Sequence, residues 1–237
     1  MRPEGSKLWP RLAFLAVVEL AYALGTRILL RQHTEGVMLE LLTTVLRVAC
    51  ISVLWRLFRE LILSRLPGDA GRSHPLLLLA LAISLVVPVV VEGHAYPLTA
   101  KLTFAATSII VAIHEEFLFR GVLQNLLERR FGRILAITCS SAAFSLFHYG
   151  TRPFWVPEFV SLFLAGCLLA LLYDGTGSLV AVIALHTVWD ILYSFGPLLS
   201  APWPFVTGLA LDVIALYLLA LWTHQRRSAS FAARPRP

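Results

Sequence analysis

Charged residues are scarce in this chain: Asp, Glu, Lys and Arg make up 14% of its 237 residues, against 58% hydrophobic residues. A typical soluble domain carries about 25% charged residues, and the mean hydropathy here is +0.76. This scarcity excludes an ordinary soluble domain and indicates a protein that crosses the membrane several times. Because the apolar runs use most of the chain, we expect a single transmembrane domain over residues 1–237.

Cysteine is rare as well. The three cysteines, Cys50, Cys139 and Cys167, fall inside apolar segments at unrelated spacings. This pattern excludes a disulfide framework and a paired-cysteine metal motif. We expect all three to be small, buried packing residues.

Three signatures of intramembrane hydrolases are missing. The zinc motif HExxH would need His at position 118, after His114 and Glu115, and that position is Leu118. The serine-type GxSG and the aspartyl-type GxGD are absent too. The sequence therefore disfavours serine, aspartyl and standard zinc mechanisms.

Long apolar runs, in contrast, are abundant. Runs that meet or approach the length of about 20 residues needed to cross a bilayer cover residues 11–30, 41–63, 75–97, 103–127, 134–150, 158–173, 178–196 and 204–223. We predict an all-α, polytopic membrane bundle of about eight transmembrane helices. Ser178 is expected to cap the seventh helix, on which His186 and Asp190 lie.

The net charge of +6 comes from Lys and Arg at helix ends and tails. Lipid headgroups and membrane orientation explain these residues, and we expect no nucleic-acid partner. The basic side of the predicted topology holds Arg2, Lys7, Arg11, Arg65, Arg72, Arg129, Arg130, Arg133, Arg226, Arg227, Arg234 and Arg236. Positive-inside counting therefore places both termini in the cytoplasm, and composition suggests a prokaryotic inner membrane. Residues 1–25 resemble a signal peptide, but Arg11 and Glu19 interrupt the apolar run, so we expect a retained first helix.

Ionisable residues inside apolar helices indicate function, because each costs about 2.5–3.5 kcal/mol to insert. They concentrate in three predicted helices, as His114, Glu115, Glu116 and Arg120, then His148, then His186 and Asp190. Glu116 and Arg120 lie four residues apart on one face, which predicts a structural ion pair. Glu115 is rotated by about 100° from Glu116 and can face another partner. Asp190 can orient His186, which is also four residues away.

This set of side chains suggests the activation of water. A carboxylate beside an imidazole can take a proton from water that attacks a carbonyl, while a second imidazole donates to the oxyanion. Glu115, His148 and His186 are also a candidate zinc set. Structural alternatives exist for single residues, since His114 can be a core histidine and His148 an interfacial one. Glu19 and Asp212 lie in outer helices without motif partners, and we assign them no role.

Together these motifs resemble those of the CAAX-processing and bacteriocin-processing (CPBP) intramembrane proteases, which include type II CAAX prenyl endopeptidases and Abi-type proteins. The family pattern EExxxR corresponds to Glu115, Glu116 and Arg120, FxxxH to Phe144 and His148, and HxxxN or HxxxD to His186 and Asp190. The motifs occur in the family's order and spacing. The resemblance defines a CPBP-like catalytic core over residues 103–196.

The resemblance implies an intramembrane endopeptidase that cleaves a membrane-anchored protein or peptide. By position, the resemblance implies that Glu115 is the general base and activates water together with His148. It implies that His186 and Asp190 stabilise the oxyanion. Glu116 and Arg120 would brace the site, that is, hold these side chains in place. Family members often carry Asn where this chain has Asp190, so this residue either donates as a neutral acid or orients His186. We expect a glutamate mechanism that requires no cofactor, with zinc left open.

Other classes of function stay open on the sequence. Buried Glu and His residues also serve proton-coupled transporters, although no inverted repeat supports that class here. A membrane scaffold or immunity protein with vestigial protease residues is a further alternative. The sequence identifies neither the substrate, nor its prenylation, nor the oligomeric state.

Overall fold

The computed structural model describes residues 5–30, 36–64, 75–90, 97–149, 156–195 and 203–232. These residues form α1 (Gly5–Leu24), η1 (Gly25–Leu30), α3 (Gly36–Ile62), α4 (Pro75–Val90), α5 (Leu98–Glu116), η2 (Phe117–Gln124), α6 (Asn125–Phe131), α7 (Arg133–Phe147), α8 (Val156–Thr176), α9 (Leu179–Ser194) and α10 (Trp203–Ala232). The elements η1 and η2 are π-helices. Helices occupy all eight predicted segments, and the described residues contain no strand.

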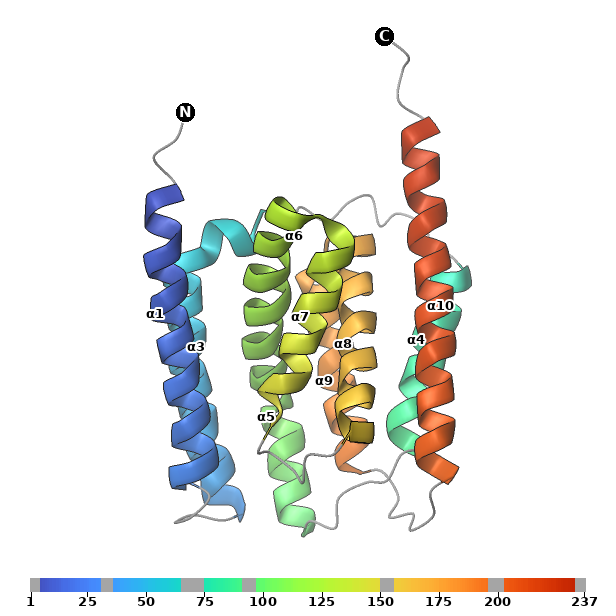
Figure 1. Ribbon diagram of the computed structural model, residues 1–237. Coiled ribbons are helices and arrows are strands. Elements are labelled where there is room, and N and C mark those ends of the chain that lie inside the picture. The colour runs from blue at the N-terminus through green and yellow to red at the C-terminus, as the bar shows by residue number, and fades with distance from the viewer. Residues whose placement is uncertain are drawn as a thin grey trace.

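The helices run side by side in one bundle (Figure 1). In the interior, α5 packs against α3 and α9, and α7 packs against α8. The helix α1 lies on one flank against α3, and α4 and α10 pair on the other. The start of α1, the α6–α7 turn and the end of α10 all lie at the upper end of the bundle in Figure 1. The first described helix therefore begins at the same end of the bundle at which the last one ends.

Four helical stretches of the described chain are long and apolar enough to cross a membrane. They are Gly36–Ile62, Leu98–Phe131, Glu158–Thr176 and Val206–Gln225. Shorter apolar helices cover Pro75–Val87, Arg133–Phe147 and Leu179–Ser194. The prediction of an all-α polytopic membrane bundle is therefore confirmed.

The short helix α7 stops within the depth of the bundle. Its 15 residues rise by about 22 Å, less than the ~30 Å of a bilayer core. In Figure 1 its lower end lies above the lower ends of α1 and α5. His148 follows directly as the C-cap of α7, so the end of this helix brings the imidazole to the interior helices.

The two helices that carry His148 and His186 are preceded by glycine or serine residues that set where each helix starts. Gly132, between α6 and α7, has φ +84°, and Gly177, before α9, has φ +67°, a region that favours glycine. Ser178 caps α9 as predicted, because its hydroxyl accepts a hydrogen bond from the Ala181 N–H at 3.2 Å. The cap sets the start of the helix that carries His186.

Candidate active site

The first motif lies at the junction of α5 and the π-helix η2. Glu115 and Glu116 end α5, Arg120 lies in η2, and all three are at most 3% exposed. The Arg120 guanidinium donates to Glu116 Oε1 at 3.0 Å and to the carbonyl of Gly166 on α8 at 2.9 Å. It also lies over the Phe144 ring at 4.7 Å. The predicted ion pair is confirmed, and it links η2 to α7 and α8.

Glu116 also holds His186, the histidine of the HxxxD motif. His186 Nδ1 donates to Glu116 Oε1 at 2.7 Å, the same oxygen that accepts from Arg120. Asp190 Oδ1, in contrast, lies 3.9 Å from His186 Nε2, beyond hydrogen-bond distance. Glu116, on another helix, therefore holds Nδ1 more closely than Asp190 approaches Nε2. Whether Asp190 orients the imidazole or donates as a neutral acid stays a prediction.

His148 is oriented by its own helix. Its Nδ1 donates to the Phe144 carbonyl at 2.9 Å, one turn earlier on α7. Its ring packs against the Phe144 ring with the centroids 4.8 Å apart, a contact that the four-residue spacing of FxxxH allows on one helix. With Nδ1 occupied as a donor, the Nε2 atom of the imidazole is left to face the site.

Glu115 is the point on which the two imidazoles converge. Its Oε2 lies 3.7 Å from His148 Nε2 and 3.9 Å from His186 Nε2. Oε2 is buried and has no hydrogen-bond partner within the described parts of the chain. Polar atoms separated by such distances are commonly bridged by a water molecule. The structure thus brings together the predicted residues from α5, α7 and α9.

The candidate zinc ligands Glu115, His148 and His186 have suitable donor atoms, and both imidazoles have their Nδ1 held by an acceptor, as metal-bound histidines usually do. Ligand atoms around a tetrahedral zinc at 2.0–2.2 Å lie about 3.4 Å apart. The separations of 3.7 and 3.9 Å exceed this value. Small side-chain movements would bring these atoms to that spacing, so the trio stays a candidate zinc set. The catalytic steps proposed below use the protein side chains alone.

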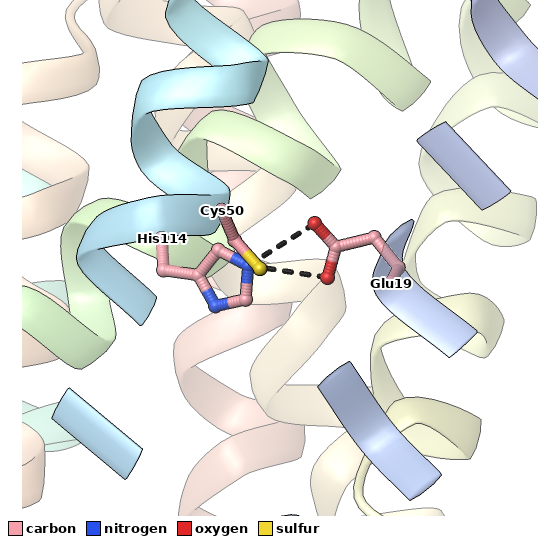
Figure 2. Close-up of side chains that lie close together, drawn as sticks. All are labelled: Glu19, Cys50 and His114. Carbon is pink, nitrogen blue, oxygen red and sulfur yellow. Dashed lines mark hydrogen bonds and ion pairs between the residues drawn. The ribbon is translucent and has the colours of Figure 1, made fainter. Parts of the chain in front are cut away.

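Sequence reasoning missed the contacts of the first helix with this region. Glu19 on α1 accepts from His114 Nε2 at 3.1 and 3.2 Å, as Figure 2 shows. Glu19, to which we assigned no role from the sequence, thus pairs with His114, which is a buried core histidine as predicted. Arg27 in η1 donates to the carbonyl of Phe147, just before His148. The sequence carries no signal for these contacts, because 95 and 120 residues separate the partners.

The cysteines only partly follow expectation. Cys50 is buried, Cys167 is half-buried and Cys139 is exposed on the bundle surface. All three are free. The prediction of burial fails for Cys139 because an apolar segment in a membrane protein has a face toward lipid as well as a face toward the core.

Comparison with protein families gives a match over the segment that contains this site. Residues 97–192 match the family model described as type II CAAX prenyl endopeptidase Rce1-like. The segment 97–192 is Rce1-like. The matched residues include the EExxxR, FxxxH and HxxxD positions, and the recognition of a CPBP or CAAX-protease-like segment is confirmed. No curated protein matches the chain.

The Rce1-like segment comprises α5 to α9 apart from the last residues of α9. These elements supply every residue of the EExxxR, FxxxH and HxxxD motifs. The match and the apolar helices support an integral membrane protein with a segment that resembles the CAAX-type proteases.

Proposed function

We propose that this chain is a glutamate-type intramembrane endopeptidase, in which Glu115 activates a water molecule to cleave a membrane-anchored protein or peptide. The observation that carries the proposal is the convergence of His148 Nε2 and His186 Nε2 on the unpartnered Oε2 of Glu115, at 3.7 and 3.9 Å. All three groups come from the Rce1-like segment.

The first step is the positioning and deprotonation of water. Since His148 donates from Nδ1 to Phe144, its neutral Nε2 is a hydrogen-bond acceptor. A water beside Glu115 and His148 donates one proton to each, and its oxygen lone pair faces the substrate carbonyl. On attack, the oxygen bonds to the carbonyl carbon and Glu115 takes the proton. Glu115 then delivers this proton to the leaving amine as the C–N bond breaks.

The second step is stabilisation of the oxyanion. His186, when protonated on both nitrogens, donates from Nδ1 to Glu116 and keeps its Nε2 proton for the oxyanion. The buried Arg120 and Glu116 fix this ring, because Glu116 accepts from both of them. Asp190 lies 3.9 Å from the same Nε2. As a neutral acid, it would supply a second donor beside His186.

The direct test compares the wild type with Glu115→Gln on a library of membrane-anchored peptides in detergent micelles. Loss of the general base is expected to slow cleavage by about 10²–10⁴-fold, with unchanged thermal unfolding. Glu60→Gln, an exposed change on α3, is the matched control and should keep wild-type activity. Full activity of Glu115→Gln would refute the assignment.

Metal dependence is tested in the same preparation. After treatment with a strong chelator, the wild type is expected to cleave at its original rate, with no metal bound at stoichiometric level in the active site. Activity that disappears on chelation and returns with zinc would contradict the metal-free part of the proposal. No cleavage of any peptide by the wild type would favour the vestigial scaffold.

A further inference from the structure

A second cluster of reactive side chains lies outside the site described above, where three helices meet. Glu19 on α1, Cys50 on α3 and His114 on α5 are 8%, 5% and 0% exposed. One carboxylate oxygen, the Cys50 Sγ and one imidazole nitrogen all lie within 4.8 Å of one another. Figure 2 shows the Cys50 sulfur and His114 Nε2 together on the side that faces the Glu19 carboxylate. The cluster takes no part in the proposed hydrolysis.

The donor atoms are those that a zinc-class cation selects. Thiolate sulfur, imidazole nitrogen and carboxylate oxygen bind Zn²⁺ at about 2.0–2.3 Å. The separation of 3.1–3.2 Å between His114 Nε2 and the Glu19 oxygens is close to the spacing of about 3.4 Å between two ligands of one tetrahedral ion. The Cys50 Sγ lies within 4.8 Å of both other ligand atoms, so its side chain must move toward them to bind the same ion.

The charges of such a site balance. A divalent cation, the Glu19 carboxylate, the Cys50 thiolate and a neutral His114 sum to zero. An uncompensated charge is costly in the interior of a membrane bundle, and a neutral assembly avoids that cost. The three ligands come from three different helices, so an ion would fasten them together.

We propose that Glu19, Cys50 and His114 form a structural binding site for a divalent cation of the zinc class, which joins α1 and α3 to α5 beside the catalytic Glu115. Binding displaces the thiol proton of Cys50 and requires the proton of His114 to move from Nε2 to Nδ1. Because Nδ1 has no partner within the described chain, the buried N–H stays unsatisfied. Binding is therefore weaker than in a site with four protein ligands, and it strengthens as pH rises.

The test uses Co²⁺ as a spectroscopic substitute for Zn²⁺. The full chain is purified in detergent, treated with chelator and dialysed against Co²⁺. The wild type is expected to bind one ion and to show the near-ultraviolet charge-transfer band of a thiolate–cobalt bond. The proposed catalytic residues contain no sulfur, so this band reports on a cysteine outside them and is independent of protease activity.

Cys50→Ser is expected to abolish the band, while Cys139→Ser and Cys167→Ser keep it. Glu19→Gln should weaken Co²⁺ binding at least tenfold. Zn²⁺ should raise the unfolding temperature of the wild type but not of Cys50→Ser, whose metal-free unfolding gives the control for correct folding. Absence of the band from the wild type, or its persistence in Cys50→Ser, would overturn the proposal. Neither result would bear on the role of Glu115.

A charge variant supplies an independent check. Arg47 lies one turn before Cys50 on α3, with its guanidinium 5.9 Å from the centre of the Tyr22 ring. A neighbouring cation disfavours a bound metal ion. Arg47→Gln is therefore expected to tighten Co²⁺ binding, and weaker binding in this variant would count against a cation at this position.

Discussion

At the scale of single residues, Glu116 joins two parts of the site, because it binds both Arg120 and His186; we call this its hub role. One of its oxygens accepts from Arg120 at 3.0 Å and from His186 at 2.7 Å. Arg120 is 1% exposed, and a buried charge that loses its partner is strongly destabilising. The carboxylate thus stabilises the bundle and orients the imidazole of the proposed oxyanion site.

We therefore expect Glu116→Gln to lower the free energy of unfolding by about 3 kcal/mol or more, because Arg120 is left as an uncompensated buried cation. The double variant Glu116→Gln/Arg120→Met should recover much of this loss. Thermal or denaturant unfolding in detergent measures both. Equal stability of Glu116→Gln and the wild type would contradict the hub role, and Glu60→Gln is the exposed control.

Asp190 provides a second prediction at this scale. Since Glu116 already orients His186, the negative charge of Asp190 is not needed for that purpose. Asp190→Asn, which supplies an amide donor, is expected to keep cleavage within a few-fold of the wild type. Asp190→Leu, which removes the donor, should lose about 10²-fold. A severe loss in Asp190→Asn would instead show that the carboxylate charge is required.

At the scale of helices, the site depends on how closely α8 approaches α7. A Cβ added to Gly166 on α8 would lie 3.1 Å from the Cα and Cβ of Ser141 on α7 and 3.3 Å from the Phe144 ring. The carbonyl of Gly166 also accepts from Arg120. This glycine therefore permits both the close packing and the hydrogen bond to the brace.

Gly166→Ala is expected to push the two helices apart, with a loss of about 1–3 kcal/mol in stability. Cleavage should fall as well, because Phe144 and His148 move with α7. Unfolding curves and initial rates measure the two effects. Gly25→Ala is the matched control, since no atom lies within 4 Å of the added Cβ there. If Gly166→Ala had the stability and the cleavage rate of the wild type, the close approach of α8 to α7 would not be required for either.

At the scale of the whole molecule, the arrangement of helix ends bears on orientation. The start of α1 and the end of α10 lie at one end of the bundle, together with the α6–α7 turn (Figure 1). This turn contains Arg129, Arg130 and Arg133. Basic residues favour the cytoplasmic side, so this end of the bundle is the one we expect to face the cytoplasm.

Reporters fused separately to the two ends of the chain test this orientation in a bacterial host. Both are expected to be active only as cytoplasmic reporters, and a single cysteine in place of Arg130 should be labelled only after the membrane is opened. Two ends on opposite sides would contradict an even number of membrane crossings. Labelling of position 130 in intact cells would show that this end of the bundle faces the outside, opposite to the expected orientation.

Much of the site was predictable because it depends on local spacing. Glu116 and Arg120 are four residues apart, as are Phe144 and His148, and a helix places such residues on one face. The cap at Ser178 was predictable for the same reason. The contact of Glu116 with His186 Nδ1 was not predictable, because spacing shows which residues can meet on one helix, but not which residue of another helix reaches the same side chain.

The sequence by itself determined the all-α membrane architecture and the identities of the site residues, because hydropathy and short-range periodicity are properties of neighbouring residues. Only the tertiary structure decided which groups meet across helices. It paired Glu116 with His186, Glu19 with His114, and both imidazoles with Glu115. These contacts join residues 33 to 95 positions apart, and helix packing, rather than any local pattern, brings such residues together.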